Sequence, residues 1–269
     1  MRILFCGDIV GRSGREAVLT YLPRLKAELA LDFIIANGEN SAHGFGITKT
    51  ICHELFAAGV DVITSGNHIW DQREIMSYID QEKRLLRPIN YPATAPGKGF
   101  IIATSTSGKK VLVINAMARL FMDPLDDPFA AIDVLLKQYP LRSAVAATIL
   151  DFHGEATSEK MSMGHFCDGR ASLVVGSHSH IPTADAQIFP GGTAYHTDAG
   201  MCGDYNSVIG MDKAAPIHRF TKKLPGERLV PANGPGTFSG TFVEVGETGL
   251  AVRVAAVIQG PRLRNLLPE

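Results

Sequence analysis

The chain has 269 residues, of which 45% are hydrophobic and 20% are charged. A chain of this length and composition can bury a sizeable core, which excludes bulk disorder. The 26 Lys and Arg residues nearly balance the 27 Asp and Glu residues, so there is no electrostatic reason to expect a nucleic-acid polymer as an obligate partner.

The first third of the chain alternates between strand and helix patterns. Short apolar runs predict three strands, at residues 3–5, 33–36 and 60–64. Apolar residues recur every three or four positions between residues 18 and 29, which predicts a helix that Pro23 kinks or divides. Thr48 is expected to cap a second helix that stops at Gly59, and Asp71 is expected to cap a third.

The rest of the chain is expected to contain more strands than helices. Residues 100–104 and 111–115 flank Gly108 and predict a hairpin, and Asp127-Pro128 opens another helix. Four further strands are expected, at residues 145–152, 173–175, 237–245 and 250–258. From residue 184 onward we expect mostly strands and turns. No repeat or linker interrupts the pattern, so residues 1–269 are expected to form a single α/β domain, with a mixed sheet or two packed sheets and helices outside.

No apolar run in the sequence is long enough to act as a signal segment or to span a bilayer. We therefore expect a cytoplasmic protein without a membrane partner. The four cysteines lie far apart and form no C-x-x-C pair. We expect them to be buried bystanders, in neither a disulfide nor a zinc knuckle.

Candidate metal ligands follow the predicted strands. Asp, Glu, Asn and His side chains stand directly after five of these strands, at Asp8, Glu39, Asn40, Asn67, His68, His153, His178 and His180. In α/β sheets, ligands bind in the crevice beyond the carboxyl ends of the strands. A single residue of this kind is more often a cap, but the five groups together favour a metal site.

The types of donor indicate which metals would bind. An extended His-x-His at His178 and His180 would place both rings on one side of the chain, where they could serve one metal or one metal each. Carboxylate and imidazole donors suit Mn, Fe or Zn, and the absence of nearby thiolates argues against a structural zinc centre. Glu39 can bridge two cations, which a neutral amide does less well.

Five motifs in order resemble those of the calcineurin-like metallophosphoesterases. They are Gly7-Asp8, Gly38-Glu39-Asn40, Gly66-Asn67-His68, His153-Gly154 and Gly176-Ser177-His178-Ser179-His180. The segments GDIVGRSGR, NGENSAHGFGIT, SGNHIWD, HGEATSEK and TDAGMCGDYNSVIG are most similar to the YmdB-like branch of bacterial phosphodiesterases. The resemblance runs from Arg2 to about Gly210. It implies a four-layer sandwich of two packed mixed β-sheets flanked by helices.

The resemblance also implies two metal ions, Fe or Mn above all. The implied ligands of the first metal are Asp8, Glu39 and His180, and those of the second are Glu39, Asn67, His153 and His178. Two positions depart from the wider superfamily, because Val10 stands where a metal-binding His is common and Glu39 replaces a bridging Asp. Asn40 is the expected substitute ligand for the first metal, ahead of His43.

The implied activity is hydrolysis of small phosphodiesters or nucleotides, with 2′,3′-cyclic nucleotides as the expected substrates. A hydroxide shared by two cations about 3.5–4 Å apart would attack in line, and His68 would protonate the leaving oxygen. Candidate substrate contacts are Arg12, Arg15, Tyr205 and Asn206. The chain could also assemble as a homo-oligomer.

Other functions stay open on the sequence alone. A phosphomonoesterase could share the same fold, and a metal- or nucleotide-binding regulatory protein could hydrolyse substrate only incidentally. A dinuclear amidohydrolase would also use His-x-His, but it needs a longer barrel chain and a ligating Lys or further Asp that we cannot place.

Further polar side chains near the motifs are expected to support the site. Those expected to cap turns or to orient a ligand are Asp71, Asp151, Glu155, Asp198 and Asp204. His196 is a weaker candidate for the site itself.

Overall fold

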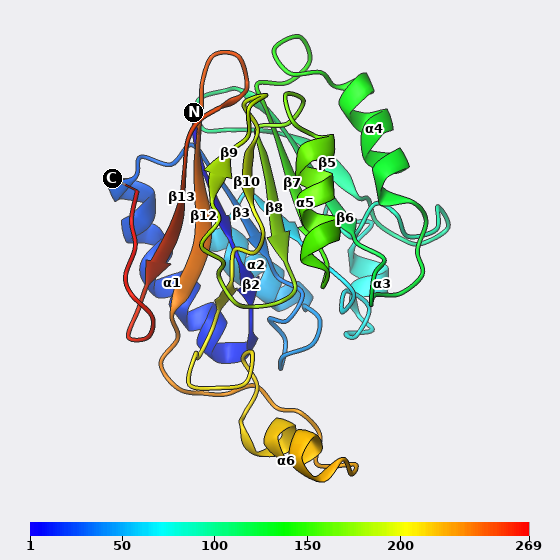
Figure 1. The fold of residues 1–269 in the computed structure, drawn as a ribbon, viewed down its shortest axis with the longest axis vertical. Helices are drawn as coiled ribbons and strands as arrows, with labels where there is room; N and C mark the ends of the chain where they lie inside the picture. The colour runs from blue at the N-terminus through cyan, green and yellow to red at the C-terminus, as the bar shows by residue number, and fades with distance from the viewer. Residues whose placement is uncertain (269) are drawn as a thin grey trace.

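The computed structural model describes residues 1–268 and contains two large mixed β-sheets packed face to face (Figure 1). The first sheet has the order β13 (Ala251–Gln259), β12 (Phe238–Val245), β1 (Arg2–Cys6), β3 (Phe33–Asn37) and β4 (Val62–Thr64). The second has the order β5 (Phe100–Thr104), β6 (Lys110–Met117), β7 (Ala147–His153), β8 (Leu173–Ser177), β10 (Ala194–His196) and β9 (Gln187–Ile188). A two-stranded sheet pairs β11 (Met201–Cys202) with β2 (Asp8–Ile9).

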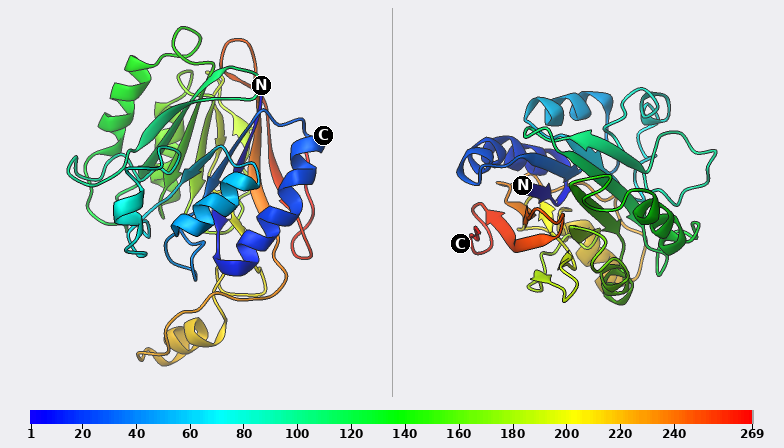
Figure 2. Two further views of the ribbon diagram at one scale, coloured as in Figure 1. Left: turned by 180° about the vertical axis from the view of Figure 1, so that it is seen from behind. Right: turned by 90° about the horizontal axis from the view of Figure 1, so that it is seen from above.

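Helices cover the outer face of each large sheet. The first sheet carries α1 (Gly11–Glu28), α2 (Lys49–Ala57) and α3 (Ile75–Tyr78), and the second carries α4 (Pro128–Gln138) and α5 (Thr157–Phe166). Figure 2 shows α1 and α2 side by side over the first sheet when the molecule is seen from behind. The resulting order of helix, sheet, sheet and helix confirms the expected four-layer sandwich.

The alternation of side chains along the strands explains this layering. In β1, Ile3 and Phe5 are buried between the two sheets, whereas Leu4 is buried under the helices. Successive residues of a strand point to opposite faces, so a strand that is apolar throughout is covered on both sides. The central strands β1, β3 and β4 run parallel to one another, as do β6, β7, β8 and β10. Their carboxyl ends therefore meet at shared edges of the sandwich.

Local signals placed several elements correctly. The side chain of Thr48 accepts a hydrogen bond from the backbone of Ile51 at 3.3 Å, as expected of a helix cap. That of Asp127 accepts one from Phe129 at 2.9 Å, at the start of the helix that Asp127-Pro128 was expected to open. The four cysteines are free and buried, as expected. Among residues 1–268, no helix combines the length and the apolar character needed to cross a bilayer.

Other expectations about the elements are wrong. Helix α1 continues undivided through Pro23, because its neighbours Leu22 and Leu25 are buried against the sheet and this packing outweighs the lost backbone hydrogen bond. Helix α3 is a single turn that begins at Ile75, so Asp71 does not cap it. Strand β4 begins two residues later than expected.

Two helices were not expected at all. Helix α5 lacks a clear apolar period, and its buried face includes a lysine and a glycine. Helix α6 (Ala214–Lys222) lies in a segment expected to hold mostly strands and turns. Figure 1 shows that α6 protrudes from the end of the sandwich at which β1 and β8 terminate.

Candidate metal centre

The candidate ligands gather at the carboxyl edge of the central strands. Each follows or ends a strand: Asp8 stands two residues after β1, Glu39 and Asn40 follow β3, Asn67 and His68 follow β4, His153 ends β7, and His178 and His180 follow β8. Most of these side chains are buried, which for carboxylates and imidazoles requires compensating partners. The site lies at the end of the sandwich from which α6 extends (Figure 1).

One group of donors surrounds the Nε2 atom of His153. This atom lies 3.1 Å from Oε1 of Glu39, 3.1 Å from Oδ1 of Asn67 and 3.1 Å from Nδ1 of His178. A single ring nitrogen can donate one hydrogen, so it cannot satisfy three neighbours at once. Four nitrogen and oxygen donors at this spacing suit a cation placed among them.

A second group consists of Asp8, Glu39 and His180, whose donor atoms all lie within 4.8 Å of one another. Beside it, Oδ1 of Asp8 and Oδ1 of Asn40 are buried, and neither has a hydrogen-bond partner among residues 1–268. The amide nitrogen of Asn40 donates to the carbonyl of Gly44 at 3.1 Å, which fixes the orientation of its amide group. Because buried oxygens without partners are costly, these two atoms fit a bound cation.

Glu39 belongs to both groups. Its Oε1 faces His153, and its Oε2 accepts a hydrogen bond from the backbone nitrogen of His68 at 3.2 Å. Gly66 packs directly beside this carboxylate, because a Cβ at residue 66 would overlap Oε2 of Glu39 and the ring of His153. The glycine of the Gly-Asn-His motif is therefore required for the two groups to come together.

The two histidines after β8 reach the site through a turn. The φ angles of His178 and His180 are +95° and +66°, so the expectation of an extended His-x-His is wrong. The backbone nitrogen of His178 donates to Asp8 at 3.1 Å, and that of Ser179 donates to Asp198 at 3.1 Å. This left-handed backbone sends one ring to each donor group, and such strain is typical of functional sites.

Burial and mutual charge shift the pKa values of these side chains strongly. Burial raises the pKa of Asp8 well above its usual range. Burial would also raise that of Glu39, but the neighbouring charge and hydrogen bond of His153 lower it to about 2. Burial opposes charge on His153, yet Glu39 and Asp8 raise its pKa to about 9. Burial lowers the pKa of His180, and burial with the charge of His153 lowers that of His178 to about 3. A proton on His153 therefore offsets the negative charge of the carboxylates, and a bound cation could take over this role.

Hydrogen bonds behind the site fix the orientation of its rings. Nδ1 of His153 lies 2.9 Å from the hydroxyl of Ser177, which in turn donates to Asp151 at 2.6 Å. The hydroxyl of Ser177 thus accepts a hydrogen bond from Nδ1. In the neutral ring, Nε2 then carries no hydrogen and can bind a metal through its lone pair. Nδ1 of His180 donates to the carbonyl of Ile209 at 2.8 Å and likewise leaves Nε2 available.

His68 lies at the margin of the site. Its Nδ1 is 2.9 Å from the carboxylate of Asp71, and its ring meets that of Phe45 edge-on, with centroids 5.1 Å apart. The ring is 28% exposed and belongs to neither donor group. Its other nitrogen, Nε2, has no hydrogen-bond partner within residues 1–268 and is open to a substrate or solvent.

The remaining supporting residues occupy varied places. The carboxylate of Glu155 lies 3.4 Å from Nε2 of His178 and is 53% exposed. Asp204 accepts from the backbone of Asn206 and Gly234 and so holds a loop. Both ring nitrogens of His196 form hydrogen bonds, Nδ1 with the hydroxyl of Thr241 and Nε2 with the carbonyl of Thr183. His196 belongs to neither donor group.

Three further residues that the sequence singled out lie near the site but outside both donor groups. Val10 is buried against Met201 and Met211. His43 is exposed and lies outside both donor groups. The hydroxyl of Tyr205 donates to the carbonyl of Met201 at 2.9 Å, so this side chain holds the loop that follows β11.

Three residues of the site were missed in the sequence. Ser177 and Ile209 orient histidines, and Lys160 forms a buried ion pair of 2.8 Å with Asp198. Ser177 lies within the Gly-Ser-His-Ser-His motif, so its position was a usable signal. The role of Ile209 depends only on its backbone carbonyl, and the burial of Lys160 depends on contacts distant in the sequence, so neither left a local pattern.

The fold is that of the metallophosphoesterases, which confirms the resemblance seen in the sequence. The family model described as "YmdB-like protein" matches residues 4–257, and the chain belongs to this family. It is 47% identical to the 2′,3′-cyclic-nucleotide 2′-phosphodiesterase of Bacillus subtilis strain 168, over 96% of this chain and 97% of the relative.

Solved structures agree with this assignment. A crystal structure of a protein from Thermus thermophilus has a TM-score of 0.89 and 40% identity, covering 97% of this chain and 99% of that one. The crystal structure of a phosphatase from Mycoplasma pneumoniae also has a TM-score of 0.89, with 30% identity, covering 97% of this chain and 93% of that one.

Proposed function

We propose that the protein is a metal-dependent hydrolase of small phosphodiesters, with 2′,3′-cyclic nucleotides as its substrates. The observation that carries this proposal is the shared position of Glu39, which links two sets of donors that each suit a cation. The activity in the name of the Bacillus subtilis relative supports the choice of substrate.

Two cations, Fe or Mn, would occupy the two donor groups. The proposed ligands of the first are Asp8, Glu39, Asn40 and His180, and those of the second are Glu39, Asn67, His153 and His178. When bound, the cations would supply an activated water and positive charge for the phosphoryl oxygens. Imidazole, carboxylate and amide donors suit both metals.

The side chains of the protein have separate parts in the reaction. Asp151, through Ser177, would hold a hydrogen on Nδ1 of His153 and so turn Nε2 toward the cation, and Glu39 and Asp8 would balance the positive charge of the cations. With hydrogen on both ring nitrogens, His68 would give the proton on Nε2 to the departing ribose oxygen as the phosphorus–oxygen bond breaks and the oxygen of water becomes attached to phosphorus, which leaves His68 as a neutral ring. Asp71 keeps Nδ1 of His68 occupied and so directs the other nitrogen outward.

A proton donor matters most for a diester of a basic alcohol. A ribose alkoxide is a poor leaving group, whereas an aryl oxide leaves without protonation. His68→Ala should therefore lower kcat toward a 2′,3′-cyclic nucleotide by about 10²–10⁴-fold, and much less toward an aryl phosphodiester. Metal content should stay near that of the unaltered protein.

His53→Ala is a matched control, because His53 is exposed on α2 and lies outside both donor groups. Loss of metal from the His68→Ala protein would show that His68 is a ligand and not the proton donor. Equal turnover of a phosphomonoester and the cyclic diester by the unaltered protein would favour a phosphomonoesterase. No turnover of either by metal-loaded protein would favour a regulatory protein.

A further inference from the structure

A basic cleft of about 660 Å³ includes His43, in the loop that begins with the candidate ligand Asn40. Its walls are the start of α1, the loop at residues 40–46, Gln72 and the segment 228–233 that returns from α6. Three arginines line it, Arg12, Arg15 and Arg228, together with His43. These four residues come from three separate parts of the chain, so the fold brings the positive charge together.

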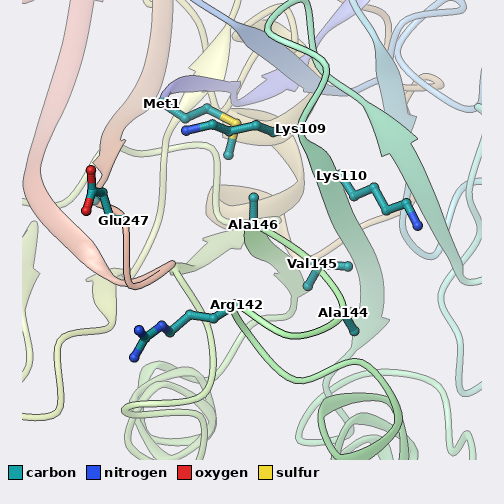
Figure 3. A pocket seen from close by; sticks show the side chains of 9 residues that line it. Met1, Lys109, Lys110, Arg142, Ala144, Val145, Ala146 and Glu247 are labelled. Atoms are coloured by element: carbon teal, nitrogen blue, oxygen red, sulfur yellow. The ribbon is translucent and has the colours of Figure 1, made fainter.

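The cleft has no Asp or Glu among the described residues that line it. In this it differs from the other basic hollow of the molecule, at the amino ends of β6 and β7, which Figure 3 shows with Lys109, Lys110 and Arg142. That hollow also contains the carboxylate of Glu247, and Lys110 points away from the other charged side chains (Figure 3). The cleft beside the metal centre thus combines several cationic side chains with a lining free of carboxylates.

Two of the arginines and the histidine are available to a ligand. Arg228 and His43 make no side-chain hydrogen bond or ion pair within residues 1–268. Arg12 pairs with Glu16 at 2.6 Å, but the two side chains are 73% and 57% exposed, and such surface pairs are weak.

Arg15 is held more firmly at the wall of the cleft. It donates to the carbonyl of Ser41 at 2.5 Å and pairs with Glu54 at 3.3 Å. Its charge is therefore partly balanced, and Arg12 and Arg228 are the freer cations of the cleft.

The cleft shares two walls with the metal centre. His43 lies in the loop that begins with Asn40, whose carbonyl accepts from the backbone of Gly11 at 2.9 Å. Gln72 directly follows Asp71, the partner of His68, and donates to the carbonyl of Phe45 at 2.7 Å. A substrate whose cyclic phosphate lies at the metal centre would therefore extend past His68 into a region of positive charge.

We propose that this cleft binds a second phosphate of the substrate, so that the preferred substrate is a short oligonucleotide ending in a 2′,3′-cyclic phosphate. The inference rests on the proposed function of the metal centre. Arginine guanidinium groups bind phosphate with two parallel hydrogen bonds, which suits three arginines in one cleft. A cyclic mononucleotide without another phosphate leaves these groups unused.

The test compares kcat/KM for three substrates of the metal-loaded enzyme. They are a 2′,3′-cyclic mononucleotide, the same nucleotide with a 5′-phosphate, and a dinucleotide ending in a 2′,3′-cyclic phosphate. We expect the dinucleotide to exceed the plain cyclic nucleotide by at least about tenfold at low salt, with the gain falling as salt is raised. An equal gain for the 5′-phosphate would also support the second-phosphate site and would show that a terminal phosphate suffices.

Arg228→Gln should reduce the ratio of the dinucleotide to the mononucleotide toward one, and Lys110→Gln, in the hollow of Figure 3, should leave that ratio unchanged. Equal kcat/KM for all three substrates, or a gain that survives in Arg228→Gln, would overturn the inference. Either result would leave the proposed function intact, because that function fails only if none of the cyclic phosphates is hydrolysed.

Discussion

The buried ion pair between Lys160 and Asp198 holds the histidine turn in place. Nζ of Lys160 lies 2.8 Å from Oδ2 of Asp198, and the two side chains are 1% and 0% exposed. The same carboxylate accepts from the backbone nitrogen of Ser179 at 3.1 Å and from that of Gly200 at 2.9 Å. Lys160→Met would leave this carboxylate buried without its cation while keeping a side chain of similar length.

The expected loss of stability follows from the burial. Removing one partner of a buried ion pair costs about 3–5 kcal/mol, and the two backbone donors that remain on Asp198 place the expected loss near the lower end. For a chain somewhat larger than 250 residues, each kcal/mol shifts Tm by about 2–4 °C or slightly less. A loss of about 3 kcal/mol thus predicts a fall in Tm of roughly 6–12 °C at most.

The assay is thermal unfolding together with a Mn²⁺ titration of the same protein. We expect Lys160→Met to lower both Tm and metal affinity, because the turn that carries His178 and His180 loses part of its anchor. Lys137→Met is the matched control, since Lys137 pairs with Asp133 at 2.6 Å but is 74% exposed. If Lys160→Met melted like the unaltered protein and bound Mn²⁺ equally well, the turn would not depend on this ion pair.

Three further predictions follow from the centre itself. Gly66→Ala should abolish metal binding without unfolding the protein, because the new methyl group displaces Glu39 and His153. Far-ultraviolet circular dichroism checks the fold, and metal analysis checks binding. Full metal content would contradict the prediction. In metal-free protein, the free energy of unfolding should fall as pH rises from about 6.5 to 9. The folded-state pKa of His153 is raised to about 9, so its stabilising proton is lost over that range. Urea unfolding at several pH values measures this free energy. Metal binding should release a proton near pH 7, because the pKa of His153 is raised to about 9 and its Nε2 must lose a hydrogen to bind a cation. Calorimetry in buffers of different ionisation enthalpy detects the release, and heats independent of the buffer would contradict it.

Local signals in the sequence carried much of the fold and of the candidate site. A polar residue directly after an apolar run marks the end of a buried strand, and parallel strands bring such ends together. Asp8, Glu39 and His153 could therefore be placed in one pocket from the sequence alone. The caps at Thr48 and Asp127 were equally local and equally predictable.

The features that escaped prediction depend on contacts or backbone angles that no short pattern encodes. Helix α5 buries Lys160, although lysine is usually found at the surface. Its ion-pair partner, Asp198, lies 38 positions later in the sequence. The His-x-His segment looked extended because alternation was its simplest interpretation, whereas the left-handed angles of His178 and His180 are imposed by hydrogen bonds to Asp8 and Asp198. Helix α6 buries little of its surface against the sandwich, so no buried face in this segment predicted a helix.

The central claim is that one carboxylate, Glu39, joins two cation sites. Anomalous diffraction from a crystal of the protein grown with Mn²⁺ tests this directly. Two peaks about 3.5–4 Å apart on either side of the Glu39 carboxylate are the predicted result. A single peak, or two peaks that do not share Glu39, would contradict the account.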